Sequence, residues 1–429
     1  MFFITLILLT ASIMDDCQLV SKTAQFDGTN LLFSDSVEIE NDLGTVVATK
    51  ASFEDKERSI LLEQGVKFIF KKGGELQSDT AKINLTAKTI SLFSKDKIIF
   101  KESLNGENIS IKSSRAECAF NSSLKKSSTN DINSITFDGG VEMNYKNNLL
   151  EGERAEYKKG FAEPEVILSS KERCFFKHNK DEIFALSAKF YPNSEDLFLE
   201  EPIGKIHFNA YLFDVAAKEG IYKKRNNEFI LQKEVSVKDE FWGSLKTDKV
   251  ILSKEEKKMV AEGKTFLNLE SRKGKLTFIG TATLDDEKRE LSITASNEPL
   301  LFQDDKMVIL ADRAHIFYNT TREPSKLTLK GNIRFVSKQI NGKNSYGIAD
   351  EVEYNLLTQE ILFTGLEDKK VVFWQENDAL AISANRVIVK KDPLTKKEEV
   401  KGIGDVRFSL DFEEEKIIKD LFSKYLDKL

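Results

Sequence analysis

Histidine and cysteine, the residue types that most often build catalytic and metal sites, are scarce in this chain: its 429 residues include three of each. The cysteines lie far apart and the histidines lie in different parts of the chain, so neither type shows the spacing of a zinc site or a disulfide framework. The six positions are Cys17, Cys118, Cys174, His178, His207 and His315. The sequence therefore predicts no metal site and no cofactor.

The short motifs of the common enzyme classes are also missing. There is no Gly-x-Ser-x-Gly, no P-loop and no His-Glu-x-x-His, and Gly402-Ile403-Gly404 lacks the third glycine of a dinucleotide site. Acidic residues recur singly, and nothing selects a glycosidase-type pair of carboxylates. We therefore predict that the chain is not an enzyme, with a polysaccharide-active enzyme as the remaining catalytic alternative.

Charge of one sign does not dominate. The 64 basic and 70 acidic residues give a net charge of −6, and the two signs are interspersed along the chain. This distribution predicts no nucleic-acid partner, because such a partner requires a basic patch. Only six prolines occur, and 40% of the residues are hydrophobic, including 31 phenylalanines, which excludes a collagen-like or disordered chain.

No apolar run is long. The longest one occupies the amino terminus and covers about a dozen residues, whereas a membrane-spanning helix needs about 20. No lysine or arginine precedes it. We predict that residues 1–20 are a signal peptide that directs export, or an inner-membrane anchor; a buried first strand is the third alternative.

The sequence does contain a short phrase that recurs from one end to the other. A small residue is followed by a variable position and a large apolar residue, and an acidic or small polar residue usually stands two places earlier, as in Asp79-Thr80-Ala81-Lys82-Ile83. The small residues are Ala51, Ala81, Ala155, Val250, Ala314 and Val352, with looser copies at Ala116, Ala188, Gly220 and Val387. Such repetition indicates stacked supersecondary units.

Between these copies, apolar and polar residues alternate. In residues 327–335 the odd positions are mostly apolar and the even ones polar, which is the period of a strand with one apolar face. Glycines in the middle of such stretches predict bulges that curve a sheet, and Asp27-Gly28, Asn341-Gly342 and Asp285-Asp286 predict hairpin turns. The sequence therefore predicts an all-β, antiparallel fold built from repeated hairpins.

Polar stretches predict how the chain is divided. Residues 121–133 have the composition of an exposed loop, and residues 191–196 mark the boundary between a first β domain, 21–192, and a second, 193–412. From residue 411 the apolar period becomes helical, which predicts a short amphipathic capping helix over 413–429. Its apolar stripe covers the open end of the last sheet or docks on a partner, and contains Ile417, Ile418, Leu421, Phe422, Tyr425 and Leu429.

One stretch makes a family resemblance specific. Residues 327–354 are LTLKGNIRFVSKQINGKNSYGIADEVEY, in which a strand with Gly-Asn-Ile is followed by a turn and by Ala-Asp-x-x-x-Tyr. This pattern resembles the repeat of the OstA/LptA-type lipopolysaccharide-export proteins, which include the periplasmic bridge LptA and the membrane-anchored LptC. Degraded copies at 33–53, 137–157 and 400–412 extend the resemblance over most of the chain beyond residue 20.

The resemblance implies a curved β-jellyroll, open along one side, in one or two such domains, whose apolar groove holds the acyl chains of a lipid. The inward residues of the strands would line that groove: Phe33, Val37, Ile39, Val66, Phe68, Val141, Met143, Ile333, Phe335, Val406 and Phe408. It also implies a protein of the Gram-negative periplasm, free or attached to the inner membrane, that carries or bridges lipopolysaccharide or a related glycolipid between the two membranes. The implied protein partners are other export components, joined through edge strands, and further copies of the chain, joined end to end.

The same alternation is also typical of a second class of protein. A structural or adhesive β-solenoid fills its interior with its own side chains and binds no lipid. The two hypotheses differ in whether the inward residues contact a ligand or only one another.

Overall fold

The computed structural model describes residues 18–408, apart from 42–43, 55–57, 72, 121–131, 160–162, 241–242, 270–273, 322, 339–343, 367–368, 376–380 and 392–397, together with Asp420 and Phe422. The predicted signal peptide or anchor therefore lies outside the described residues except for its last three positions. The same holds for most of the loop predicted at 121–133, for the turn at Asn341-Gly342 and for the helix predicted at 413–429 apart from Asp420 and Phe422. Within the described part, no helix is long and apolar enough to cross a membrane.

The chain divides into two compact units: unit 1 comprises residues 1–206 and 221–225, and unit 2 comprises residues 207–220 and 226–429. Unit 1 contains β1 (Gln18–Val20), β2 (Thr23–Phe26), β3 (Asn30–Asn41), β4 (Gly44–Glu54), β5 (Ser59–Phe70), β6 (Glu75–Asn84), β7 (Thr89–Leu104), β8 (Glu107–Phe120), β9 (Ile132–Tyr145), β10 (Asn148–Lys159), β11 (Pro164–His178), β12 (Asp181–Tyr191) and β13 (Asp196–Glu200). The domain boundary predicted at 192/193 falls in the turn between β12 and β13, inside unit 1.

Unit 2 contains the remaining strands apart from two that hold residues of both units, β14 (Ile203–Phe208) and β16 (Glu219–Lys223). A 3-10 turn, η1 (Lys224–Asn226), follows β16. The strands of unit 2 are β15 (Tyr211–Ala216), β17 (Glu228–Asp239), β18 (Gly243–Ser253), β19 (Lys258–Leu269), β20 (Gly274–Asp285), β21 (Glu290–Ala295), β22 (Leu300–Gln303), β23 (Met307–Ala311), β24 (Arg313–Tyr318), β25 (Pro324–Lys338), β26 (Asn344–Asn355), β27 (Glu360–Thr364), β28 (Val371–Gln375), β29 (Ala381–Ala384), β30 (Arg386–Lys391) and β31 (Glu398–Ile403).

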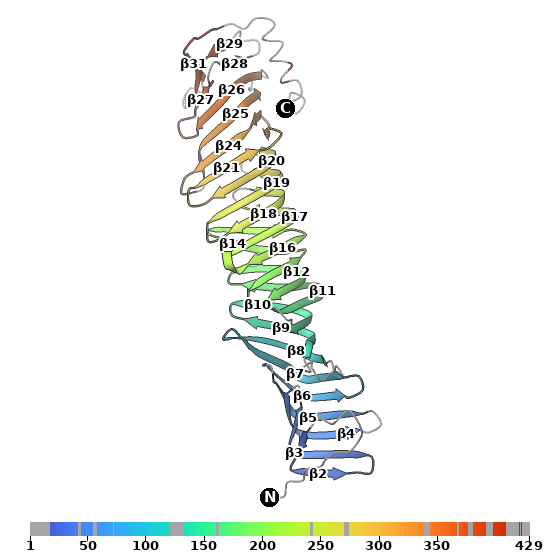
Figure 1. The fold of residues 1–429 in the computed structure, drawn as a ribbon. Helices are drawn as coiled ribbons and strands as arrows, with labels where there is room; N and C mark the ends of the chain where they lie inside the picture. The colour runs from blue at the N-terminus through green and yellow to red at the C-terminus, as the bar shows by residue number, and fades with distance from the viewer. Residues whose placement is uncertain are drawn as a thin grey trace. The chain divides into compact units, whose positions relative to one another are not determined.

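The strands of each unit pair antiparallel, mostly with the next strand along the chain. Examples are β6, β7 and β8 in unit 1 and β17, β18 and β19 in unit 2, and Figure 1 shows this order within each unit. Two predicted hairpin turns are present, since the Asp27 carboxylate accepts the backbone N–H of Thr29 and the Asp285 carboxylate accepts that of Lys288. The predicted all-β, antiparallel fold is therefore confirmed.

Many of the long strands bend at a corner, where the inward-facing positions shift by one residue. In β4, Ala48 and Ala51 are buried and the two residues between them are exposed, and the pairing register shifts at the same place. Glycine occupies several corners: Gly65 and Gly331 have φ angles of 76° and 80°, which glycine adopts without strain. The bulges predicted at these glycines are confirmed, and the shift keeps apolar residues facing inward on both halves of the strand.

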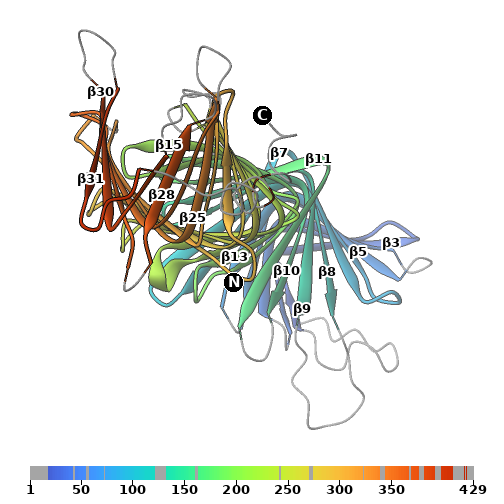
Figure 2. The same cartoon turned by 90° about the horizontal axis from the view of Figure 1, so that it is seen from above.

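A corner places the two halves of one strand in two different sheets. The first half of β26 pairs with β28, and its second half pairs with β27. β29 continues the sheet of β28, whereas β30 and β31 continue that of β27; Figure 2 shows β30 and β31 apart from β25 and β28. Side chains of both sheets meet between them, and the Phe335 ring centroid lies 5.2 Å from that of Phe363 and 6.2 Å from that of Phe373.

The acidic residue of the repeated phrase has a structural role at the corners. The carboxylates of Asp79, Asp248 and Asp350 each accept a hydrogen bond from a backbone N–H 16 residues later, at 2.8, 2.9 and 3.0 Å respectively. In the first of these, the N–H of Lys95 is the main cause that lowers the pKa of Asp79. The recurring carboxylates therefore fix neighbouring corners to one another, which explains their repetition without any catalytic role.

Candidate functional site: the apolar interior

The inward residues predicted from the alternation do line the interiors of the two units. Those with at most 4% of their surface exposed are Phe33, Val37, Ile39, Val66, Phe68, Val141, Met143 and Ile333. Phe335 is half-buried, and its ring lies so close over Gly347 that a Cβ there would meet it at 1.8 Å. The inward placement of these residues is confirmed, whereas their contact with a lipid stays a prediction.

Val406 and Phe408 do not face an interior, so that prediction is wrong. They are 39% and 65% exposed. β31 ends at Ile403, and the strand pairing that follows it among the described residues is an isolated bridge between Arg407 and Ser383. Alternation assigns a residue to a face only within a paired strand, and here the pairing has ended.

The interior of unit 1 contains a buried polar group among aromatic rings. Glu102, which is 5% exposed, accepts a hydrogen bond of 2.5 Å from the Tyr157 hydroxyl and forms an ion pair with Lys159. Burial is the main cause that raises the pKa of Tyr157. The Phe100 ring centroid lies 5.1 Å from that of Tyr157 and 5.8 Å from that of Phe137. Because Glu102 lies on β7 and its two partners on β10, this cluster joins two strands that are not neighbours in the pairing order.

His178 forms a second buried polar cluster in unit 1. Its Nδ1 lies 2.7 Å from Oδ1 of Asn148, and its Nε2 lies 3.3 Å from the hydroxyl of Tyr222. A neutral imidazole satisfies both contacts, because Nδ1 can donate to the amide oxygen while Nε2 accepts from the hydroxyl. The histidine is therefore buried and hydrogen-bonded at both ring nitrogens, which is a structural role.

One constellation in unit 2 contains the residue types of a hydrolase triad. Nδ1 of His315 lies 2.7 Å from the Glu290 carboxylate and 3.2 Å from the Ser292 hydroxyl, which itself donates to Glu290 at 2.9 Å. A working triad needs the serine and the carboxylate on different ring nitrogens, so that the ring can pass a proton between them. Here both lie on Nδ1, and the arrangement does not support nucleophilic catalysis.

The described residues also offer no reactive thiol and no metal site. Cys118 and Cys174 are buried, and burial raises their thiol pKa values to about 12 and about 11, so both remain protonated at neutral pH. Among the described residues, no group of three or more His, Cys, Asp and Glu side chains could hold a metal ion. The feature that remains for function is the apolar interior itself.

Unit 2 has a hollow in its interior. A cavity of about 50 Å³ is lined almost wholly by apolar residues of β15 and β17 to β21: Phe213, Val237, Asp239, Gly243, Leu245, Met259, Ala261, Leu267, Phe278, Ala282, Leu284, Leu291 and Ile293. Ala261 and Ala282 are directly paired partners on β19 and β20. Two small side chains opposite each other leave space that larger ones would fill, and this pair explains why the hollow lies here.

The hollow is small for a lipid. An apolar cavity of roughly 150 Å³ holds one benzene molecule, so a cavity of about 50 Å³ accommodates the end of an acyl chain at most. A lipid with several chains could enter only if the facing sheets moved apart. The cavity therefore marks a place where the packing of the unit 2 interior leaves space.

Comparison with known proteins bears on one part of the chain. Residues 301–393 match the family described as LptA/(LptD N-terminal domain) LPS transport protein. These residues are a domain of that family. Its members are transport proteins of lipopolysaccharide (LPS), which agrees with the absence of enzyme motifs from the sequence. No curated protein matches the chain.

Among solved structures, the chain is similar to LptH, described as the LptA homologous periplasmic component of the conserved lipopolysaccharide transport device from Pseudomonas aeruginosa. The identity is 8%, the similarity covers 31% of this chain and 84% of LptH, and the TM-score is 0.26. The family assignment rests on the match at 301–393. That range contains residues 327–354, from which the family resemblance was inferred, so the predicted resemblance is confirmed there.

The LPS transport domain contains one feature that the alternation did not predict. Val336, Tyr346, Trp374 and Ala381 are buried together although they stand at positions expected to face water. In unit 1, Glu102 could have been recognised from the sequence, because it shares the parity of Ile98 and Phe100, which are inward.

Proposed function

We propose that this chain is a periplasmic lipid-transport protein that carries or bridges lipopolysaccharide, or a related glycolipid, between the inner and outer membranes. The observation that carries the proposal is the LPS transport domain at residues 301–393. The apolar interiors of the two units support it. A lipid leaves a membrane only if an apolar surface receives its chains, since each CH₂ group removed from water contributes roughly 0.8 kcal/mol.

The route for the acyl chains in this proposal is the space between the facing sheets. The cavity beside Ala261 and Ala282 is the natural starting point, because it needs no displacement of packed side chains to receive the first methylenes. Further chain length would enter by separating side chains that now contact one another. The curved jellyroll, open along one side, which the family resemblance implies, is the architecture that permits this movement.

The proposed partners besides the lipid are other export components and further copies of the chain. Among the described strands β2 pairs only with β3, and all four of its residues are exposed. β2 contains no proline and no lysine, the residues that commonly blunt an edge strand. An edge of this kind can accept a strand from a second protein by backbone hydrogen bonding.

Site-specific photo-crosslinking in cells that make lipopolysaccharide tests the route. A photoreactive residue replaces Leu267, which lines the cavity, or its neighbour Phe266, which is 46% exposed on the opposite face of β19. We expect lipid adducts at position 267 and none at position 266. Equal labelling at both positions, or no labelling at 267 in a folded protein, contradicts the proposal.

A second function, a structural scaffold with a self-filled core, is favoured by the tight packing. The predicted groove residues that are buried have at most 4% of their surface exposed, so they contact other side chains in this structure. Native mass spectrometry of the purified chain separates the two functions. Glycolipid bound in stoichiometric amounts supports transport, whereas a ligand-free chain from cells rich in lipopolysaccharide supports the scaffold.

Export is part of the proposal and is tested by cell fractionation. We expect residues 1–20 to direct the chain to the periplasm and to be cleaved, because their apolar run is too short to span a bilayer. Full-length protein that stays in the inner membrane after a carbonate wash would show an anchor instead.

A further inference from the structure

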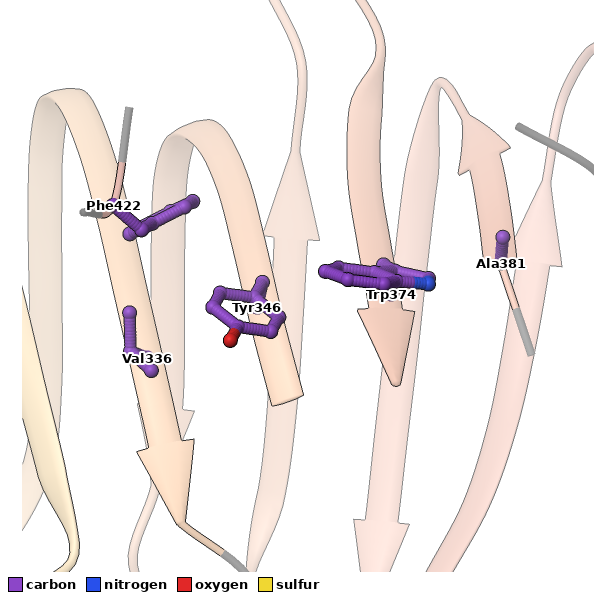
Figure 3. Packing of buried hydrophobic residues seen from close by; sticks show 5 residues of the cluster. All are labelled: Val336, Tyr346, Trp374, Ala381 and Phe422. Atoms are coloured by element: carbon purple, nitrogen blue, oxygen red, sulfur yellow. The ribbon is translucent and has the colours of Figure 1, made fainter. Parts of the chain in front are cut away.

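An apolar patch lies on the face of a unit 2 sheet that points away from the interior. It consists of Val336, Tyr346, Trp374 and Ala381, and we call it the outer aromatic patch; Figure 3 shows its members side by side. They are successive cross-strand partners on β25, β26, β28 and β29. Their sequence neighbours Phe335, Gly347, Phe373 and Ile382 pair in the same way and point to the interior side, where the Phe335 and Phe373 rings meet.

The patch differs from the outward face elsewhere on the same strands. Near the other end of β25 and β26, the outward positions carry the ion pairs Lys330–Glu351 and Lys326–Glu353, at 2.9 and 3.1 Å. Outward residues of that kind need no cover, because water solvates them. By contrast, four apolar side chains in a row across four strands need a cover, since a sheet face in water normally carries polar residues.

The cover visible in the structure is Phe422, from the C-terminal end of the chain. Its side chain is 1% exposed, and its ring centroid lies 5.3 Å from that of Tyr346, which in turn lies 4.8 Å from that of Trp374 (Figure 3). Two flanking residues on the same face, Ile348 and Val372, are partly buried against the cluster. A single ring does not extend over the whole row, so Phe422 accounts for only part of the cover.

The point at which the chain leaves the sheet favours the chain's own C-terminal segment as the occupant of the outer aromatic patch. Arg407 exchanges two backbone hydrogen bonds of 2.8 Å with Ser383, which lies two residues from Ala381 on β29 and therefore on the same face. The chain thus leaves the sheet beside the patch. A short tether of this kind raises the effective concentration of the segment at the patch to the order of millimolar.

We propose that the outer aromatic patch is a binding site for an amphipathic helix, and that its occupant is residues 413–429 of the same chain, anchored by Phe422. In the helix that the sequence predicts, Ile418, Tyr425 and Leu429 lie on the same stripe as Phe422 and extend the contact along the patch. The docked segment shields an apolar surface that would otherwise promote association between copies. This inference is independent of whether the interior carries lipid.

Trp374 provides a direct readout of docking. The chain has two tryptophans, so Trp242→Phe leaves Trp374 as the only reporter. In this background, a variant that ends at residue 412 should show red-shifted emission, because Trp374 loses its cover. Adding a synthetic peptide of residues 413–429 should restore the blue-shifted emission in a saturable manner.

Two altered peptides separate specific docking from general stickiness. A Phe422→Ala peptide should bind at least tenfold more weakly, whereas a Lys424→Ala peptide, changed on the opposite side of the helix, should bind as the original does. Equal affinities for the two peptides, or no binding of the original one, would overturn the proposal.

If the shortened variant does not fold, the full-length chain provides a second test. In the Trp242→Phe background, Phe422→Ala should make Trp374 several-fold more accessible to a soluble quencher such as acrylamide, and Lys424→Ala should leave it as protected as before. Unchanged protection in both variants would show that Phe422 does not hold a cover over the patch, and the proposal would fail.

Discussion

The two units use the same kind of strand and corner but pack their interiors differently. In unit 1, the small residue of the repeated phrase faces large neighbours: Ala155 pairs with Phe137 on one side and with Leu168 on the other. In unit 2, Ala261 pairs with Ala282, and a cavity of about 50 Å³ lies beside them. The comparison indicates that a hollow is left where two small residues are directly paired, although the strand pattern is the same in both units.

The largest expected effect on stability comes from breaking the Glu102 cluster. Unit 1 has this buried polar cluster, whereas the cavity of unit 2 is lined almost wholly by apolar residues. Glu102→Ala leaves the Tyr157 hydroxyl and the Lys159 ammonium without the buried carboxylate. We expect a loss of about 2–3 kcal/mol in the free energy of unfolding of unit 1, because the buried Tyr157 hydroxyl loses its charged acceptor, whereas the Lys159 side chain is 34% exposed and loses less. Hydrogen exchange followed by mass spectrometry measures this in peptides of β7 and β10.

The control for that experiment is Glu75→Ala, which removes a more exposed ion pair with Lys67 in the same unit. Its cost should stay below about 1 kcal/mol. Similar costs for the two variants would mean that the Glu102 cluster does not hold β7 and β10 together.

The next effect tests the packing contrast with one substitution made in both units. Ala155→Leu in unit 1 should destabilise it by about 1–3 kcal/mol, because the site is already filled. Ala282→Leu in unit 2 should be neutral or stabilise it by up to about 2 kcal/mol, because the side chain enters an existing cavity. Urea unfolding with hydrogen exchange as the unit-specific readout checks both.

The same two substitutions also test the proposed lipid route. If the cavity starts the lipid route, Ala282→Leu should lower the yield of lipid adducts at position 267, whereas Ala155→Leu should not. A filled cavity with an undiminished adduct yield would place the lipid elsewhere in the chain.

A smaller effect compares two corner glycines. At Gly65 of unit 1 a Cβ would meet nothing within 4 Å, so Gly65→Ala costs only the strain of its positive φ, roughly 1–2 kcal/mol. At Gly331 of unit 2 a Cβ would lie 2.4 Å from the Asp312 carboxylate, which accepts a hydrogen bond from Asn332. Gly331→Ala should therefore cost about 1 kcal/mol more than Gly65→Ala, measured by urea unfolding. Equal costs would show that the carboxylate moves freely and does not hold the corner.

The smallest effect is a pH dependence in unit 2. The hydrogen bond from His315 is the main cause that holds the pKa of Glu290 below its ordinary value of 4.5. Because the folded-state pKa is lowered, this contribution to stability is present above pH 4.5 and is lost as the pH falls through the folded-state pKa. Glu290→Gln should therefore destabilise the chain by less than about 1 kcal/mol at pH 6, and the difference should shrink towards pH 3. A difference that stays constant over this range would contradict the assignment.

The sequence predicted the parts of the fold that depend on periodicity. Alternation placed Val37, Val66, Met143 and Ile333 inside, because two-residue periodicity maps directly onto the faces of a strand. The glycine before Val66 predicted a bulge, because a positive φ favours glycine over other residues. The family resemblance was inferred from a stretch of the domain that the family match later identified.

The sequence could not predict features that depend on which distant segments meet. The phrase before Phe408, Gly-Asp-Val-Arg, resembles Gly-Asn-Ile-Arg before Phe335, yet Phe408 is exposed and Phe335 is half-buried, because only Phe335 lies in a paired strand. The role of Asp79 was hidden, because its partner N–H comes from the next strand. Tyr346 and Trp374 were missed because alternation assigns them to water, whereas in the structure they are buried together with Phe422, which is distant in the sequence.

Because most strands pair with the next strand along the chain, this pairing also affects how each unit folds. Most contacts that close a strand onto its partner span one hairpin, so little loop entropy opposes each step, and pairing can start at several places and spread. Unfolding should then proceed by loss of terminal strands such as β2 before the middle of the unit opens. For the same reason, inserting or deleting one hairpin should change the length of a unit while leaving the pairing of the remaining strands intact.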